Sequence, residues 1–258
     1  PQFQIDYIRV QSVMAVPMRF RNKVMGVLVV VNRVDERSFI QNDQNLLQAL
    51  ADQASVSIYY ARFSAALDEK RRLDYDLGIA HRIQQALLPK EIPVVSGAEF
   101  AAFTLPAQEI GGDYYDFVQI DDTHVGIAIA DVSGKGVAGA LVMALCRSAL
   151  RIKAQGCLSP SAVLRSMHKI LSADLSEDMF ITMLYMILDT ANLELRVARA
   201  GHLSPIVNPG AGQAMPWLVD SSGIAIGIAD ADAFAAALEE RTVMLAPGDT
   251  VVIYTDGV

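Results

Sequence analysis

Two strand-like segments joined by a short polar turn constrain the fold of this chain more than any other feature. Residues 114 to 120 and 124 to 130 are rich in apolar side chains, and Asp121-Asp122-Thr123 between them is typical of a hairpin turn. A hairpin pairs its strands antiparallel, whereas successive parallel strands need a crossover helix between them. The sequence therefore predicts an α+β domain with antiparallel pairing rather than an alternating βαβ fold.

Further strands and helices are predicted in the same region. Strands are expected at 98 to 105, 180 to 188, 192 to 199 and 250 to 254. Helices are expected at 137 to 153 and from Ser159 to about Leu171. Ser159 before Pro160 suits an N-cap followed by a first-turn proline.

The N-terminal part has a different organisation. Residues 13 to 32 predict two valine-rich strands around Arg21-Asn22-Lys23, and residues 42 and 43 offer helix-capping side chains. From 44 to 88 apolar residues recur at gaps of three and four, which predicts one long helix or two stacked helices. The second half carries a short heptad seam, and two interpretations of it remain open. It forms a coiled coil between two chains, or it packs on its own domain.

Composition excludes several classes of protein. At 258 residues, 52% of them hydrophobic, the chain is long enough for one large well-packed domain or for one and a half smaller ones. A net charge of -8 disfavours nucleic-acid binding, because no basic face is available to neutralise phosphates. Cys146 and Cys157 lack histidines at ligand spacing, which excludes a zinc site and a disulfide framework. Without a signal peptide or an apolar run of roughly 20 residues, we expect a cytoplasmic bacterial protein with no membrane span.

The segment ADVSGKG at 130 to 136 raises a choice between two chemistries. A P-loop needs a glycine that is separated by four residues from the Gly-Lys pair, and a Ser or Thr directly after that pair. Ile129 and Gly136 occupy those two positions, so a P-loop is excluded. The carboxylate of Asp131 at the end of an apolar strand instead indicates a metal ligand.

Two further motifs place aspartates in similar positions. Asp113 and Asp116 lie in GGDYYDF, at the start of the strand expected to pair with the one that ends at Asp131, and Asp256 lies where VVIYT meets a glycine. Carboxylate oxygens are the ligands that hard divalent cations prefer, and glycines let backbone carbonyls approach closely. Asp-Gly pairs also form turns, but three such motifs, each at one end of an apolar strand, favour a metal site.

A series of motifs runs through this region to the end of the chain. They are LLP (87–89), GGDYYDF (111–117), ADVSGKGVAGALVMA (130–144), DMFITMLYMILD (178–189), ARAGHLSPIV (198–207), GIAIGI (223–228) and LAPGDTVVIYTDGV (245–258). In order and spacing they resemble the PP2C-like (PPM) serine phosphatases of the SpoIIE/RsbU type. The resemblance implies an αββα sandwich of two antiparallel sheets with two Mn²⁺ or Mg²⁺ ions in the cleft between them. It also implies hydrolysis of phosphoserine by a metal-activated water, without a covalent phosphoenzyme.

The resemblance also implies a ligand set. Asp113, Asp131 and Asp256 match the family's metal-binding aspartates. Val132 matches a residue whose backbone carbonyl reaches the metal. The family's last metal aspartate lies in an Asp-Asp-x-Thr segment well beyond the TDGV motif, whereas this sequence ends at Val258. We therefore expect a phosphatase domain without its C-terminal end, an incomplete site and impaired activity.

Other polar residues near these motifs have weaker assignments. Asp116, Gly134 and Lys135 are candidates for a supporting role around the metals. Asp116 equally suits a turn cap, and Gly134-Lys135-Gly136 equally suits the turn into the next helix, whose N-terminus favours an anion. No serine nucleophile elbow accompanies His202 in AGHLSP. The resemblance places this histidine in a turn near the cleft, so we expect a structural role for it.

The first residues resemble the last part of a GAF sensory domain, through VMAVPMRFRNKVMGVLVVVNR followed by an Ala-rich helix. The expected organisation is thus a GAF-like segment (1–62), a linker helix for dimerisation and signal relay (63–95) and the phosphatase domain (96–258). The implied partners are a phosphorylated STAS-type anti-sigma-factor antagonist as substrate, a second copy of the chain, and an unidentified signal at the GAF segment. The alternative is a non-catalytic regulatory or scaffold module that binds a phosphoprotein.

Overall fold

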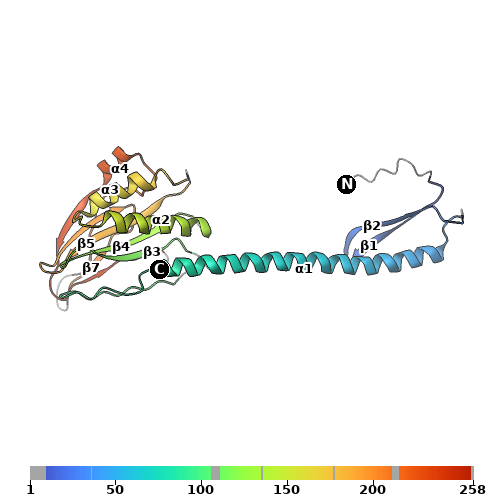
Figure 1. The fold of residues 1–258 in the computed structure, drawn as a ribbon, viewed down its shortest axis with the longest axis horizontal. Helices are drawn as coiled ribbons and strands as arrows, with labels where there is room; N and C mark the ends of the chain where they lie inside the picture. Colours follow the sequence, from blue (N-terminus) through green and yellow to red (C-terminus); the bar gives the residue numbers. More distant parts are fainter. Residues whose placement is uncertain are drawn as a thin grey trace. The chain divides into compact units, whose positions relative to one another are not determined.

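The computed structural model describes two units in this chain. It covers residues 10–35, 37–105, 111–134, 136–176, 178–210 and 215–256. The units divide between Asp74 and Tyr75, so the helix α1 (Gln41–Leu87) contributes to both (Figure 1). This boundary falls inside the stretch 63 to 95 that the sequence predicts as a linker helix. Each unit has its own hydrophobic core.

The first unit is an antiparallel β-ribbon packed on the start of α1. Strands β1 (Val13–Phe20) and β2 (Lys23–Val31) form the hairpin that the sequence predicts. Val16 of β1 buries its side chain against Leu47 and Ala51 of the helix. Because Leu47 and Ala51 are four residues apart, they lie on one face of α1, and this face meets the ribbon.

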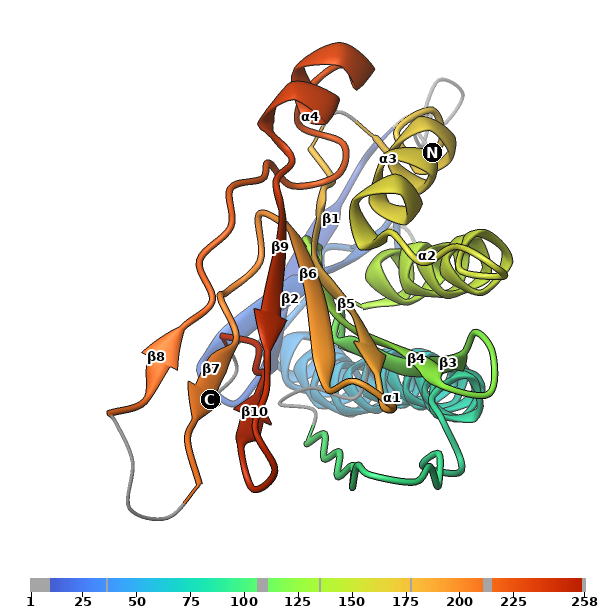
Figure 2. The same cartoon turned by 90° about the vertical axis from the view of Figure 1, so that its left-hand side faces the viewer.

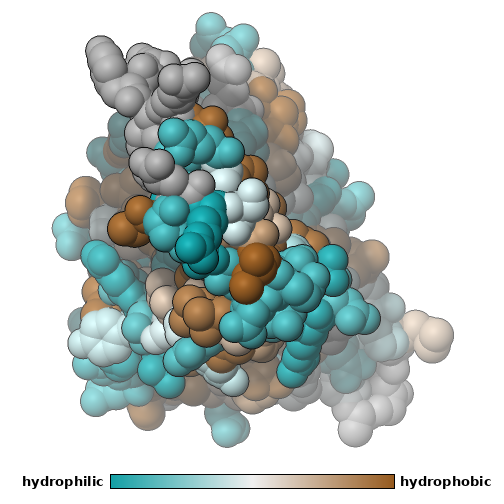
Figure 3. Space-filling model, turned by 90° about the vertical axis from the view of Figure 1, so that its right-hand side faces the viewer, coloured by the Kyte–Doolittle hydropathy of each residue, from teal (hydrophilic) through white to brown (hydrophobic). Residues whose placement is uncertain are grey.

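Much of the apolar surface of the first unit is exposed. Figure 3 shows apolar side chains (brown) interspersed with polar ones (teal) on the face it presents. Four valines of the ribbon are each more than half exposed, namely Val13, Val24, Val27 and Val29. Residues 56 to 76 of α1 are also exposed on every side of the helix, with Tyr60, Phe63 and Leu73 among them. No described helix, α1 included, combines the length and apolar character needed to cross a membrane.

The second unit contains two antiparallel sheets. One has the strand order β3-β4-β5-β6-β9, and the other has the order β10-β7-β8. The strands are β3 (Tyr114–Gln119), β4 (His124–Val132), β5 (Ile181–Asp189), β6 (Glu194–Ala200), β7 (Ile206–Asn208), β8 (Trp217–Leu218), β9 (Glu240–Met244) and β10 (Thr250–Val252). The predicted hairpin pairs β3 with β4, and neighbouring strands are antiparallel throughout both sheets. The α+β class that the sequence predicts is confirmed.

Helices and the small sheet lie on opposite faces of the five-stranded sheet. Figure 2 shows α2 (Val137–Lys153) and α3 (Pro160–Leu171) on one side and β7, β8 and β10 on the other. The central strand β5 is apolar on both faces for this reason. Its alternate residues, such as Tyr185 and Leu184, belong to the two different cores.

Some elements differ from the prediction. The strand expected at 98 to 105 is wrong, because the structure shows only an isolated bridge between Val95 and Ala98 there. Ala98 and Phe100 pack against the core below the small sheet, but Phe103 and Leu105 are 84% and 80% exposed, so no continuous buried face runs through this segment. The short strands β7 and β8, the strand β9 and the helix α4 (Ala231–Ala237) were not predicted.

Helix α4 carried a signal that the sequence interpretation missed. It lies in ADADAFAAALEE, whose Ala-rich composition obscured its pattern. The Asp230 carboxylate accepts the backbone N–H of Ala233 at 2.8 Å, which caps the helix. Phe234 then buries its whole side chain in the core. An N-cap aspartate followed four residues later by a buried aromatic residue is a helix-start pattern.

A partly buried acid strengthens the start of α3. The Ser159 hydroxyl accepts the Ala162 N–H at 3.2 Å, which confirms the predicted N-cap. The carboxylate of Glu240, the first residue of β9, accepts the Ser159 hydroxyl at 2.6 Å and the Ser161 N–H at 3.1 Å. A negative charge at a helix N-terminus is favourable, so Glu240 ties α3 to the edge of the sheet.

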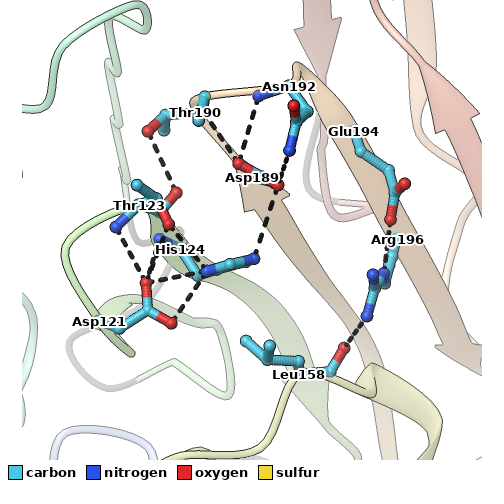
Figure 4. Close-up of polar contacts among 10 residues, drawn as sticks. Asp121, Thr123, His124, Leu158, Asp189, Thr190, Asn192, Glu194 and Arg196 are labelled. Atoms are coloured by element: carbon cyan, nitrogen blue, oxygen red, sulfur yellow. Dashed lines mark hydrogen bonds and ion pairs between the residues drawn. The ribbon is translucent and has the colours of Figure 1, made fainter.

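Polar contacts also join the hairpins at the beginning of β4 (Figure 4). His124 Nδ1 lies 2.8 Å from the Asp121 carboxylate, and its Nε2 lies 3.7 Å from that of Asp189. The Thr190 N–H donates to the Thr123 carbonyl at 2.9 Å. These contacts connect the β3–β4 turn with the β5–β6 turn, at the opposite end of β4 from Asp131.

Candidate metal centre

The three predicted metal ligands come from three segments of the second unit. Asp113 directly precedes β3, Asp131 is the penultimate residue of β4, and Asp256 follows β10 of the small sheet. The Thr255 hydroxyl donates to Asp113 Oδ2 at 3.4 Å. This contact brings the segment that carries Asp256 against the start of β3.

The three carboxylates act on one another electrostatically. Burial raises the pKa of Asp131 to about 6, with further upward contributions from the charges of Asp113 and Asp256. Burial likewise raises the pKa of Asp113, the Thr255 hydrogen bond opposes that rise, and the Asp256 charge adds to it. No described Lys, Arg or His forms an ion pair with any of the three. A bound cation would therefore relieve this concentration of negative charge.

The backbone at Gly112 and Val132 adds a carbonyl oxygen to this group. A Cβ atom at Gly112 would clash with the Val132 carbonyl oxygen and lie 2.9 Å from Asp131 Oδ1. The Val132 N–H donates to the Gly112 carbonyl at 3.3 Å. Glycine at this position lets the GGD segment lie directly on the end of β4, where the Val132 carbonyl adjoins the aspartates.

These residues fit a hard divalent cation by their donor chemistry. Carboxylates with a backbone carbonyl are the oxygen ligands that Mg²⁺ and similar ions select. Within the described ranges, however, no three Asp, Glu, His or Cys side chains are arranged as a ligand group. The centre thus has suitable donors and charge but not a preformed coordination sphere.

The turn after β4 explains the glycines of ADVSGKG. Gly134 and Gly136 adopt the left-handed backbone region, with φ of 111° and 72°. The Ser133 N–H donates to the Phe180 carbonyl at 2.9 Å, and the Phe180 N–H donates to the Ser133 hydroxyl at 2.6 Å. The loop is therefore anchored beside β5 before α2 begins at Val137. These contacts favour a turn-forming role for Gly134, whereas Lys135 lies outside the described residues.

Asp116 has partners away from the other aspartates. Its carboxylate is fully buried and pairs with Arg151 of α2, with Nε–Oδ2 at 2.6 Å and Nη2–Oδ1 at 2.8 Å. It also accepts the Tyr114 hydroxyl at 2.8 Å and the Phe117 N–H at 2.9 Å. Burial of Tyr114 and the Asp116 charge both raise the pKa of that phenol. These contacts favour a role in joining α2 to β3 over a supporting role at the metal centre.

Sequence reasoning expected a structural role for His202 but did not find its partners. Its Nδ1 lies 2.9 Å from the Thr182 hydroxyl, and its Nε2 lies 3.2 Å from the Tyr254 carbonyl oxygen. Burial lowers the pKa of His202, which favours the neutral ring. No sequence spacing relates these three residues, because they come from segments up to 72 residues apart.

The end of α1 also reaches the aspartate segment. The Gln84 side chain is buried and donates from Nε2 to the Gly111 carbonyl at 2.5 Å. Its Oε1 accepts the Gly111 N–H at 3.3 Å. Gln84, the polar residue in the apolar seam of the helix, thus forms two hydrogen bonds with Gly111, which lies two positions before Asp113.

We expect Gln84→Leu to weaken Mn²⁺ binding several-fold, because the GGD segment loses both hydrogen bonds that hold it to α1. Isothermal titration of the purified chain with Mn²⁺ measures this change. Gln85→Leu is the matched control, since the neighbouring side chain is exposed. Equal affinities for the two variants would contradict the assignment.

Comparison with known proteins identifies the second unit. Residues 121–258, just over half of the chain, match the family described as stage II sporulation protein E (SpoIIE). The chain belongs to the SpoIIE family. Residues 4–58 match the GAF domain, so a GAF segment precedes the SpoIIE region as the sequence predicts.

Relatives of this SpoIIE-family chain include named phosphatases. Phosphoserine phosphatase RsbU of Bacillus subtilis (strain 168) is 30% identical over an alignment of 196 residues, which covers 73% of this chain and 55% of the relative. Phosphoserine phosphatase RsbP of the same organism is 28% identical over an alignment of 197 residues, which covers 74% of this chain and 46% of the relative. The chain thus spans about half the length of these relatives.

A solved structure agrees with the fold. The SiaA-PP2C domain of Pseudomonas aeruginosa is 26% identical and superposes with a TM-score of 0.57, over 71% of each chain. The PP2C-type fold that the sequence motifs imply is therefore confirmed for the SpoIIE region.

Proposed function

We propose that this chain is a metal-dependent protein serine/threonine phosphatase under the control of its GAF segment. The observation that carries the proposal is the grouping of three carboxylates without a counter-ion among the described residues: burial, together with the charges of Asp113 and Asp256, raises the pKa of Asp131 to about 6. Strongly perturbed carboxyl groups without a protein counter-ion are typical of functional sites. The names of the relatives RsbU and RsbP support phosphoserine as the substrate group.

The proposed ligands are the three aspartates and the Val132 carbonyl. When bound there, Mn²⁺ or Mg²⁺ supplies positive charge for phosphoryl oxygens and lowers the pKa of a coordinated water. The chain itself holds the donors in place through Gly112, which admits the Val132 carbonyl, and Thr255, which donates to Asp113. The intact family site takes two ions, as the resemblance implies.

Substrate and partners follow from the family resemblance. The proposed substrate is a phosphoserine on a STAS-type anti-sigma-factor antagonist, and the GAF segment receives a signal that the sequence does not identify. We also propose a homodimer through α1. Its support is the exposure of residues 56 to 76 on every side of the helix, where Tyr60, Phe63 and Leu73 are each more than half exposed.

Phosphate release from a phosphoserine peptide tests the activity. We expect release with Mn²⁺, loss of release with EDTA, and loss in Asp256→Asn. Asp122→Asn is the matched control, because this exposed aspartate lies in the turn before β4. Even if phosphate release by the wild type is slow, its loss in Asp256→Asn and its retention in Asp122→Asn support the proposed activity.

The alternative function is a non-catalytic module that binds a phosphoprotein. It is favoured if the chain binds a phosphoserine protein but, in the presence of Mn²⁺, the wild type releases no more phosphate than Asp256→Asn does. The observation that favours this alternative is the lack of a preformed metal-ligand group among the described residues.

A further inference from the structure

His202 connects the two sheets of the second unit. It is 4% exposed and follows β6 of the five-stranded sheet. Its Nδ1 contacts the hydroxyl of Thr182 in β5, of the same sheet, at 2.9 Å. Its Nε2 contacts the carbonyl of Tyr254 at 3.2 Å, just after β10 of the small sheet.

The chemistry of the partners fixes the tautomer of the ring. A carbonyl oxygen only accepts hydrogen bonds, so Nε2 carries the hydrogen and donates to Tyr254. The unprotonated Nδ1, at 2.9 Å, then accepts the hydrogen of the Thr182 hydroxyl, for which the Asp131 carbonyl oxygen at 3.4 Å is the more distant acceptor. Both nitrogens are engaged and the ring is buried, which excludes His202 as a general base that takes a proton from a substrate.

Both partners of the ring lie next to aspartates of the metal centre. Thr182 pairs with Asp131 in the β4–β5 register, and its hydroxyl lies 3.4 Å from the Asp131 carbonyl oxygen. Tyr254 lies two residues before Asp256. His202 is therefore the side chain that joins the strand beside Asp131 to the segment of Asp256.

The backbone that carries His202 is itself held firmly. Arg199 donates from Nη1 to the His202 carbonyl at 2.7 Å and from Nε to the Ser221 carbonyl at 2.9 Å. Gly201 has φ of 68°, and a Cβ atom there would lie 2.7 Å from the Ala225 nitrogen. A ring on so constrained a support can fix the position of its partners.

We propose that His202 is a positioning residue of the metal centre, which sets the place of Asp256 relative to Asp131 by holding the Tyr254 carbonyl against β5. The inference rests on the proposed function, and it gives His202 no contact with substrate or metal. Groups that orient metal ligands typically contribute about 10- to 100-fold to metal affinity.

Two substitutions separate the halves of this contact. The amide nitrogen of Gln reaches the place of Nε2, so His202→Gln keeps a donor for Tyr254. Asn reaches only the place of Nδ1, so His202→Asn keeps the Thr182 contact and loses Tyr254. Isothermal titration with Mn²⁺ is expected to show about tenfold or greater weakening in His202→Asn, with most of the affinity restored in His202→Gln.

His168 provides a matched control for the loss of a buried histidine. It is 1% exposed, and its ring stacks on Phe234 of α4 with the centroids 4.0 Å apart. His168→Gln is expected to lower the free energy of unfolding while leaving the Mn²⁺ dissociation constant unchanged. The inference is overturned if His202→Asn binds Mn²⁺ within twofold of the wild type, or no more weakly than His168→Gln.

Amide hydrogen exchange in the metal-free chain gives a second readout that does not depend on metal binding. Faster exchange at Thr255 and Asp256 in His202→Asn, but not in His168→Gln, supports the positioning role. Unchanged exchange rates there overturn it. If the wild-type chain binds no Mn²⁺ while this exchange difference is present, the proposed phosphatase function fails and the role of His202 in placing Asp256 stands.

Discussion

Asp131→Asn is expected to abolish Mn²⁺-dependent phosphate release and, at the same time, to stabilise the metal-free chain. Burial, with the charges of Asp113 and Asp256, raises the folded-state pKa of Asp131 to about 6, above an unfolded value of about 3.9. The folded state therefore binds the proton more tightly than the unfolded state does. Stability falls as the pH rises from about 4 to 6, and above pH 6 the ionised carboxylate keeps the folded state at this lower stability. After a discount for solvent screening, we expect removal of this charge to stabilise the chain by about 1 kcal/mol at pH 7.5.

Denaturant unfolding with and without Mn²⁺ tests both halves of this expectation. Without metal, Asp131→Asn should be more stable than the wild type at pH 7.5, and the difference should vanish near pH 4. With Mn²⁺, the wild type should gain stability by mass action while the variant gains much less, so that the order of stability reverses. Asp122→Asn should follow the wild type in every condition. A variant that is less stable than the wild type without metal at pH 7.5 would contradict the electrostatic account.

The features that the sequence predicts are those encoded by residues close together in the chain. The Asp121-Asp122-Thr123 turn, the Ser159 N-cap and the period of α2 each need only a few neighbouring residues, and the structure confirms them. The positions of Asp113 and Asp131 at strand ends also follow from local patterns, and Asp256 lies four residues after the end of β10. How the three act together as a metal centre stays a proposal that the experiments above address.

The features that the sequence does not predict depend on contacts between distant segments. His202 meets Tyr254 across 52 residues, and Arg151 meets Asp116 across 35. The need for glycine at position 112 arises from the approach of Val132, which no local pattern encodes. The strand expected at 98 to 105 failed for the converse reason, since its local pattern has no neighbouring strand to pair with among the described residues.

Arg151→Met is expected to destabilise the second unit by about 2 to 4 kcal/mol, among the largest effects of any single change. Asp116 is fully buried, and the bidentate guanidinium of Arg151 is its counter-ion. Removal of one partner leaves an uncompensated charge in the interior, whereas removal of both leaves none. The Arg151 side chain is 43% exposed, so water entering at its position reduces the cost toward the lower value.

A double-mutant cycle with Asp116→Leu measures this pairing. The variant that carries both substitutions should recover much of the stability lost by Arg151→Met alone, because no buried charge remains without a partner. The same variants decide the role of Asp116 that the sequence left open. If Asp116 only joins α2 to β3, the double variant keeps the Mn²⁺ affinity of the wild type, and its stability stays below that of the wild type only because the Tyr114 hydroxyl is unpaired. If Asp116 instead supports the aspartates of the metal centre, Mn²⁺ affinity falls in the double variant even where stability is restored, and the assignment of Asp116 to the helix–sheet junction must be abandoned.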